Sequence, residues 1–247
     1  TGASSGIGLA IVEELLKTDC RIIAVARSIE KIDFNNDRVV KYACDISTPE
    51  NIDNLFDFIQ KEFETIDLFI SNAGFAYFGQ IEEPNWQDID SIYRTNVFSV
   101  IYMAEKMKQI FGDKPFQFAI TASAMSFLSY PGYTLYSSTK AALRGFAAAY
   151  RSELSKGQRI QMIYPIGTRS AFFETAGNNT PIPWPTQSTK TVARAAVRGM
   201  RRRSNSIFPS KLFLLLNILN GYFPVIFKLI IAVENIKFKR WLRSMAT

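Results

Sequence analysis

A tyrosine and a lysine four residues apart form a pair that could move a proton. Tyr136 and Lys140 lie in an alanine-rich segment, residues 136–155, whose composition predicts a helix. Residues four apart on a helix share one face, so both side chains could enter one site. A tyrosine has an ordinary pKa of about 10, too high for efficient proton exchange near neutral pH. A neighbouring ammonium favours the phenolate and lowers that pKa, so the pair predicts that Tyr136 acts as a general acid or base.

Ser123 is a third candidate, at the end of an apolar, strand-like run over residues 116–123. Its hydroxyl could hydrogen-bond a substrate oxygen and stabilise the charge that develops there. The chain has no histidine, which excludes Ser-His-Asp hydrolysis and metal sites ligated by histidine. Its two cysteines, Cys20 and Cys44, have neither metal-ligand spacing nor a disulfide framework. We therefore predict no metal site and expect a reducing compartment, the cytoplasm.

A glycine-rich turn, TGASSGIG, opens the sequence before a helix predicted over residues 6–18. Glycines allow positive φ and let backbone N–H groups approach a pyrophosphate, and the helix N-terminus adds partial positive charge. The turn predicts a dinucleotide site, although a tight turn without a ligand would have the same pattern. The predicted contacts are Gly2, Ser4, Ser5, Gly6, Ile7 and Gly8.

The residues after the next strand, predicted over 21–27, indicate which dinucleotide is used. An acid there would accept the ribose hydroxyls of NAD and repel a 2′-phosphate. The sequence has Ala26-Arg27-Ser28 and no acid. Arg27 could pair with a phosphate and Ser28 could donate to it, which predicts NADP(H). The alternative is that Arg27 is a solvated residue at a strand end.

Strand-like and helix-like segments alternate, which is typical of a parallel sheet covered by helices on both faces. We expect one domain over residues 1–247, within which residues 171–247 form a substrate lid and a C-terminal extension. The strand that normally precedes such a glycine-rich turn is missing before Thr1, and we expect this to leave apolar neighbours uncovered. The predicted strands are 21–27, 39–44, 66–71, 116–123 and 160–165. The predicted helices are 6–18, 48–63, 86–110 and 136–155. In the second of these helices, Thr48 is the predicted N-cap and Pro49 follows it.

Taken in order, the motifs resemble those of the short-chain dehydrogenase/reductase family. They are the glycine-rich turn, Asn72-Ala73-Gly74, Asn96 in a helix, Ser123, and the Tyr136–Lys140 pair. The resemblance runs from Thr1 to about Ser170. It implies a Rossmann-like doubly wound fold and a hydride transfer between NADP(H) and a ketone or alcohol. It also implies that Lys140 holds the nicotinamide ribose and that Asn96 supports a water-linked proton relay.

The resemblance assigns further cofactor contacts to residues that follow the strands. Asp45 would contact adenine, and Asn72, Ala73 and Gly74 would line the adenosine side and the central strand. Tyr136, Lys140, Pro165 and Ser170 would lie nearer the nicotinamide. The sequence departs from the family pattern at Pro165-Ile166, where glycine usually follows proline, and at Ser170, where threonine is usual.

The region after residue 165 is expected to build the substrate pocket. Phe172, Phe173, Pro183 and Trp184 predict a hydrophobic ketone or alcohol as substrate, unless these side chains only close the core or an oligomer contact. Residues Asn178–Gln187 contain three prolines and predict an irregular loop or lid.

The C-terminal quarter is strongly basic. Residues 190–247 hold twelve Lys or Arg and one acid, Glu234, which leaves 17 bases against 21 acids in residues 1–189. The apolar run 212–233 is interrupted by polar residues and is a poor transmembrane span. Residues 208–243 instead predict contact with an anionic membrane surface. Nucleic-acid binding through the run 201–203 is not predicted, because no recognition motif accompanies it.

Two other functions remain open on the same fold: a non-enzymatic cofactor-sensing module and a membrane-surface binding protein. The presence of both Tyr136 and Lys140 disfavours the first. By analogy with the family, a homodimer or homotetramer would form through the helices at 86–110 and 136–155.

Overall fold

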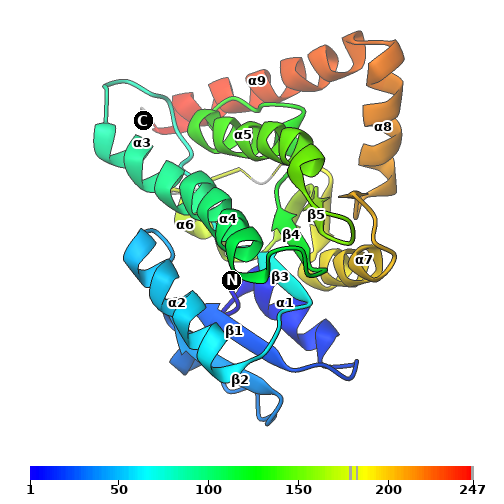
Figure 1. Cartoon of the computed structure of the whole chain (residues 1–247). Coiled ribbons are helices and arrows are strands. Elements are labelled where there is room, and N and C mark those ends of the chain that lie inside the picture. Colours follow the sequence, from blue (N-terminus) through cyan, green and yellow to red (C-terminus); the bar gives the residue numbers. More distant parts are fainter. Residues whose placement is uncertain (178–179, 182, 246–247) are drawn as a thin grey trace.

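Parallel strands alternate with helices along most of the chain (Figure 1). The structure, a computed structural model, describes residues 1–177, 180–181 and 183–245. The strands are β1 (Ile22–Ala26), β2 (Val39–Ala43), β3 (Leu68–Ser71), β4 (Gln117–Thr121), β5 (Arg159–Ile163), β6 (Gly167–Arg169), β7 (Thr186–Ser188) and β8 (Ser206–Ile207). The helices are α1 (Gly6–Leu15), α2 (Pro49–Glu62), α3 (Trp86–Tyr93), α4 (Ser99–Phe111), α5 (Thr134–Tyr150), α6 (Phe172–Ala176), α7 (Thr189–Arg201), α8 (Lys211–Tyr222) and α9 (Val225–Met245).

The five predicted strands correspond to β1–β5, with ends that shift by at most two residues. Short β-branched runs that are buried on both faces suit central parallel strands. The strands β6, β7 and β8 were not predicted, because two or three residues are too few for a sequence pattern. The helix predicted to begin after Thr48 does begin at Pro49, but the Thr48 side chain makes no capping hydrogen bond. That part of the prediction is wrong.

The strands pair in parallel but in separate groups. One sheet has the order β1-β2, a second has the order β3-β4-β5-β8, and β6 pairs with β7. Residues Thr1–Ala3 lie between the first two sheets. The N–H of Ala3 donates a hydrogen bond to the carbonyl of Val25 on β1, and the backbone nitrogen of Thr1 donates one to the carbonyl of Ile70 on β3. On β3, Ile70 is only partly buried. The strands β1 and β3 do not pair directly, but their apolar side chains are not left uncovered, contrary to the expectation: Ala24, Val25 and Phe69 are 1%, 5% and 7% exposed, because helices pack over both faces. The predicted doubly wound arrangement is confirmed.

Helices cover the strands on both faces. α2, α4 and α5 bury Phe56, Met103 and Leu143 against β3, β4 and β5. On the opposite face, α1 and α7 pack together through Ile11 and Val197 (Figure 1). Each helix contributes one apolar stripe to the core, as expected for helices that flank a sheet.

The C-terminal segment forms two helices, α8 and α9, which meet at an angle at Pro224 (Figure 1). Their inner faces pack Phe213 and Phe227 against Leu128. Among the residues that the structure describes, no helix is long and apolar enough to cross a bilayer, in agreement with the prediction. In the predicted loop Asn178–Gln187, residues 178, 179 and 182 lie outside the described residues. Residues 186 and 187 belong to β7, so that end of the loop prediction is wrong.

Candidate active site

The glycine-rich turn packs against the segment that follows β3. Gly2 and Gly6 have positive φ values of 66° and 56°, which favour glycine. Thr1 Oγ1 accepts hydrogen bonds of 3.1 Å from the N–H groups of Asn72 and Ala73. A Cβ on Gly8 would lie 2.1 Å from the carbonyl oxygen of Gly2. Gly2 and Gly8 are therefore required by the close approach of backbone to backbone, and Gly6 by its positive φ.

The first turn of α1 is open to an anion. Ser5, the N-cap residue, makes no side-chain hydrogen bond to the helix, and the first turn contains no acidic residue. The helix has ten residues, so its first N–H groups carry the partial positive charge of a helix N-terminus. Ser4, Ser5, Gly6 and Ile7 line the cleft in front of this turn. These features fit a pyrophosphate group.

Substituting Gly8 by alanine should destabilise the protein by about 1 to 3 kcal/mol, the usual range for overpacking a tight site. The obstacle is the Gly2 backbone, which cannot rotate away as a side chain can. Gly145→Ala is the matched control, because this exposed glycine on α5 has nothing within 4 Å of an added Cβ. It should stabilise the protein by about 0.5 to 1 kcal/mol. Urea unfolding measures both values, and equal effects would contradict the packing argument.

A cleft of about 570 Å³ runs along the carboxyl ends of the strands. Arg27, Ser28 and Asp45 line it at the ends of β1 and β2, and Ser123, Tyr136 and Lys140 line it near β4 and α5. Asn72, Ala73, Gly74, Pro165 and Ser170 line it between them, together with Gly2. Of the predicted site residues, only Gly8 and Asn96 do not contribute to its wall. Sequence motifs missed Val25, Cys44, Ile46, Phe75, Thr95, Thr121 and Thr168. Of these, Cys44 directly follows β2 and Thr121 ends β4, positions that could have indicated them.

The phenol of Tyr136 lies against the hydroxyl of Ser123. Tyr136 is 8% exposed, as is Ser123, and the Ser123 hydroxyl lies close enough to lower the pKa of the phenol. The Ser123 hydroxyl also accepts a 3.1 Å hydrogen bond from the N–H of Met125, which fixes its position. Burial raises the pKa of Tyr136 to about 12, and the hydrogen bond from Ser123 lowers it only in part. The sequence argument predicted a lowered pKa, but in the protein alone the loss of hydration raises it.

Lys140 is buried one helical turn from Tyr136. Its Nζ donates a 3.0 Å hydrogen bond to the carbonyl of Thr121 and lies 5.5 Å from the centre of the Tyr136 ring. The side chain is 4% exposed, and burial lowers the pKa of Lys140 to about 8. Lys140 forms no ion pair with a carboxylate of the described residues. The predicted juxtaposition of phenol, ammonium and serine hydroxyl is therefore present.

Asn96 lies in a five-residue π-helical turn, Arg94–Phe98, between α3 and α4. Its side chain is fully buried, and its amide both donates to the carbonyl of Phe75 (2.8 Å) and accepts from the N–H of Phe75 (3.1 Å). It also donates to Thr139, whose hydroxyl in turn donates to the carbonyl of Tyr136. Asn96 thus joins the loop after β3 to the helix that carries Tyr136. Its role in a proton relay stays a prediction.

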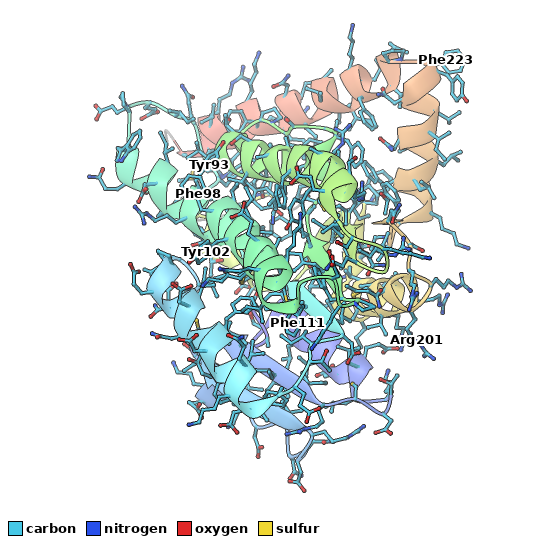
Figure 2. The ribbon with its side chains drawn as sticks, viewed as in Figure 1. Tyr93, Phe98, Tyr102, Phe111, Arg201 and Phe223 are labelled. Atoms are coloured by element: carbon cyan, nitrogen blue, oxygen red, sulfur yellow. The ribbon has the colours of Figure 1, made fainter. Side chains whose placement is uncertain are left out.

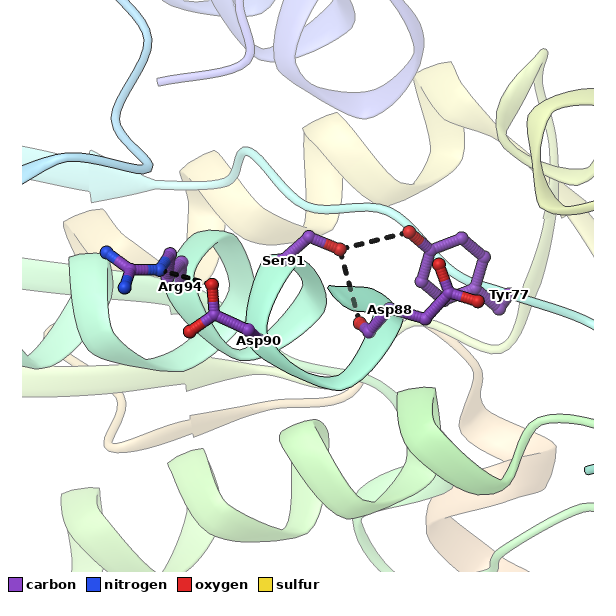
Figure 3. A network of polar contacts seen from close by, with 5 residues as sticks. All are labelled: Tyr77, Asp88, Asp90, Ser91 and Arg94. Carbon is purple, nitrogen blue, oxygen red and sulfur yellow. Dashed lines mark hydrogen bonds and ion pairs between the residues drawn. The ribbon is translucent and has the colours of Figure 1, made fainter. Parts of the chain in front are cut away.

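The loop after β3 is also tied to α3 on its outer side (Figure 3). The hydroxyls of Tyr77 and Ser91 are 3.0 Å apart, and Ser91 donates to the carbonyl of Asp88. Beside them, Arg94 pairs with Asp90 at 2.6 Å. This last pair is exposed and adds little stability. The loop that bounds the cleft is therefore held from two sides, by Asn96 inside and by Ser91 outside.

A second, apolar chamber of about 260 Å³ adjoins Ser123 and Met125. Its walls come from the segment after β4, from Pro183–Pro185, and from the inner faces of α8 and α9. Tyr130 and the ion pair of Glu234 with Lys237 (2.5 Å) are its main polar groups. Trp184 lines this chamber, whereas Phe172 and Phe173 line the main cleft. The aromatic residues predicted for a substrate pocket thus divide between two adjoining spaces.

Comparison with known proteins identifies the family of the chain. Oxidoreductase BOA17 of Botryotinia fuckeliana is 27% identical over 221 residues, which cover 86% of this chain and 80% of that protein. The 3-oxoacyl-[acyl-carrier-protein] reductase FabG of Buchnera aphidicola is 31% identical over 174 residues, covering 67% of this chain and 70% of that protein. A short-chain dehydrogenase from Sphingobium yanoikuyae, solved with NADPH, has the same fold, with a TM-score of 0.78, 22% identity and coverage of 92% and 93% of the two chains. The family model for short chain dehydrogenases matches residues 1–180, and the chain therefore belongs to the short chain dehydrogenase family.

Proposed function

We propose that this protein is an NADP(H)-dependent carbonyl reductase or alcohol dehydrogenase that acts on a hydrophobic ketone or alcohol. One observation carries the proposal: the Ser123 hydroxyl, the Tyr136 phenol and the Lys140 ammonium converge in a cleft that also contains an open helix N-terminus. The alternative of a non-enzymatic module on this fold has no observation in its favour.

When bound, NADP(H) supplies or accepts the hydride. The residues that would hold it are those of the glycine-rich turn, with Arg27 and Ser28 at the adenosine end and Lys140 at the ribose of the nicotinamide end. The cleft volume of about 570 Å³ lies within the usual range for a ligand site. Asp45, Asn72, Ala73 and Gly74 line it between these ends, with Pro165 and Ser170 opposite.

Tyr136 transfers the proton that accompanies the hydride. In reduction, its phenol donates a proton to the substrate oxygen, and in oxidation the phenolate accepts it. The Ser123 hydroxyl is held by the N–H of Met125 and can donate to the same substrate oxygen. Lys140 stabilises the phenolate that remains after proton donation, because a charge in a buried site acts more strongly than one in water. Asn96 is a positioning residue in this scheme, with its part in a water relay as a further prediction.

The preference for NADP(H) rests on Arg27 and Ser28. Both are exposed at the end of β1 and line the cleft, where no carboxylate follows the strand. A guanidinium can bind a phosphate with two parallel hydrogen bonds. The NADPH found in the Sphingobium structure is consistent with this assignment, though it was observed in that protein.

Arg27→Ala should weaken NADPH binding by about 10- to 100-fold, the range for loss of a hydrogen bond to a charged group. NADH binding should change little, because NADH lacks the 2′-phosphate. Arg21→Ala is the matched control: this exposed arginine precedes the same strand at its other end, where its guanidinium lies over Phe63. Fluorescence titration of each protein with both cofactors measures the ratio of its affinities for NADPH and NADH. Equal affinities of the parent protein for NADPH and NADH would contradict the assignment.

The substrate class follows from the chamber beside Ser123. Its lining is mainly aliphatic and aromatic, and such a space accommodates an apolar chain or ring next to the reacting oxygen. The decisive assay follows NADPH oxidation with ketones of increasing apolar size. The value of kcat/KM should rise with apolar size until the chamber is filled, and a preference for small polar ketones would contradict this substrate class. We also propose that the helical segment 86–110, from α3 to α4, and the helix α5 form the subunit contact of a homodimer or homotetramer.

A further inference from the structure

The outer faces of α8 and α9 are apolar and exposed. Sixteen large apolar side chains are exposed in the part of the chain that the structure describes, and eleven of them lie between residues 212 and 245. This concentration far exceeds the scattered apolar residues of an ordinary protein surface. A concentration of exposed apolar side chains of this kind marks a site of interaction with another molecule.

The exposed residues form a stripe along each helix. On α8 they recur at Leu215, Leu219 and Tyr222, a spacing of four and three residues that keeps them on one face. The inner face of the same helix buries Phe213. A surface helix usually turns polar residues outward, so a helix that is apolar on both faces has a partner on each.

The second stripe continues the pattern on α9. Val225, Leu229 and Ile236 share one face and are 54% to 62% exposed, while Phe227 is buried against the protein. The protein core already covers the inner face. Within the described residues, the outer apolar face of α9 is therefore exposed, as the outer apolar face of α8 is.

Aromatic side chains mark the corner where the two helices meet. Tyr222 is 78% exposed and Phe223 is 61% exposed, and both precede Pro224. Figure 2 shows Phe223 at the outer edge of the molecule, at the junction of α8 and α9. Exposed aromatic residues at a projecting edge are typical of contact with the interfacial region of a bilayer.

The charge of this surface indicates which kind of molecule it binds. Arg240 and Arg243 lie four and seven residues beyond Ile236, so they continue the apolar stripe of α9 as a basic end. Lys211, Lys228 and Lys239 are also exposed, and none of these five cations pairs with a carboxylate within the described residues. A second copy of the chain would bring like charges together, whereas an anionic lipid surface satisfies both the apolar stripe and the cations.

We propose that α8 and α9 are a docking surface for an anionic lipid bilayer and lie in the interfacial plane with their apolar stripes toward the acyl chains. No described helix is long and apolar enough for a span, which is consistent with a helix pair that rests on the surface. The inner faces of the same helices line the apolar chamber beside Ser123. Docking would therefore place that chamber next to a reservoir of apolar molecules. This last consequence rests on the proposed function, and the docking itself does not.

Vesicle flotation of the full chain tests the docking without any measurement of activity. The protein should float with vesicles of phosphatidylcholine mixed with phosphatidylglycerol, and much less with phosphatidylcholine alone. High salt should weaken the binding, because it screens the basic residues. Leu229→Glu combined with Ile236→Glu should abolish flotation. Ile81→Glu is the control, because Ile81 is 58% exposed and lies outside α8 and α9 and outside the predicted subunit contact.

A second pair of variants tests the charges. Arg240→Ala with Arg243→Ala should lower the partition coefficient on the mixed vesicles roughly thirtyfold, since each surface cation contributes about 1 kcal/mol. Arg201→Ala with Arg202→Ala removes the same charge at the exposed end of α7 (Figure 2, Arg201) and should have a smaller effect. Circular dichroism verifies that each variant is folded. The proposal fails if the parent protein floats with neither vesicle or if the glutamate variant still floats. It also fails if sedimentation shows that the stripes join two copies and no vesicle binding occurs.

Discussion

Replacing Tyr136 by phenylalanine should lower kcat about 10²- to 10⁴-fold while the protein stays folded and still binds NADPH. This range is the usual contribution of a positioned general acid or base. The substitution removes only the phenol oxygen that meets the Ser123 hydroxyl, and the ring keeps its contacts with Phe172 and Tyr133. Steady-state rates of NADPH oxidation with an apolar ketone give kcat, and fluorescence titration gives the cofactor affinity.

Tyr133→Phe is the matched control for this experiment. Tyr133 lines the same cleft, its ring lies 6.3 Å from that of Tyr136, and its hydroxyl donates to the carbonyl of Pro181. If the reaction needs the phenol of Tyr136 in particular, the Tyr133 variant should keep most of its activity. A Tyr136→Phe protein that retains most of the parent rate would overturn the proposed mechanism.

The second large effect is expected from Lys140→Met. The activity should fall by about 10² or more, because the ammonium stabilises the phenolate and would hold the nicotinamide ribose. Unlike Tyr136→Phe, this change should also weaken NADPH binding. The side chains have similar length, and methionine suits a buried site, so the variant should remain folded. Comparison of kcat with cofactor affinity for both variants separates a proton-transfer role from a binding role.

The same variant gives a stability test that is independent of activity. Burial lowers the pKa of Lys140 to about 8 from its ordinary 10.5. Between these values the unfolded chain holds a proton that the folded chain has lost, so the free energy of unfolding rises with pH. This contribution is about 2 kcal/mol from pH 8 to pH 10. The buried tyrosines have raised pKa values and act in the opposite direction above pH 10, but they are common to both proteins.

Urea unfolding at several pH values between 8 and 10, without cofactor, measures this difference. The parent protein should gain about 2 kcal/mol relative to Lys140→Met over the range. Parallel curves for the two proteins would mean that the Lys140 ammonium is hydrated in the folded state. That outcome would contradict the buried site described above.

Local chemistry in the sequence determined the order of elements and most of the site. The glycines, the apolar runs of β1–β5 and the four-residue spacing of Tyr136 and Lys140 depend on backbone sterics and helical geometry, which act over a few residues. Asn72, Asp45 and Arg27 could be placed at the cleft because each follows a parallel strand, and the carboxyl ends of such strands meet at one edge.

Only the tertiary structure decided properties that depend on distant partners. The pKa of Tyr136 rises because residues far apart in sequence exclude water from it. The bonds of Asn96 to Phe75 and Thr139 join three elements, and no local pattern specifies them. The strands β6–β8 form only where pairing partners are available. The apolar sequence of α8 and α9 was equally compatible with a core, and packing alone determined that one face covers the chamber while the other stays exposed.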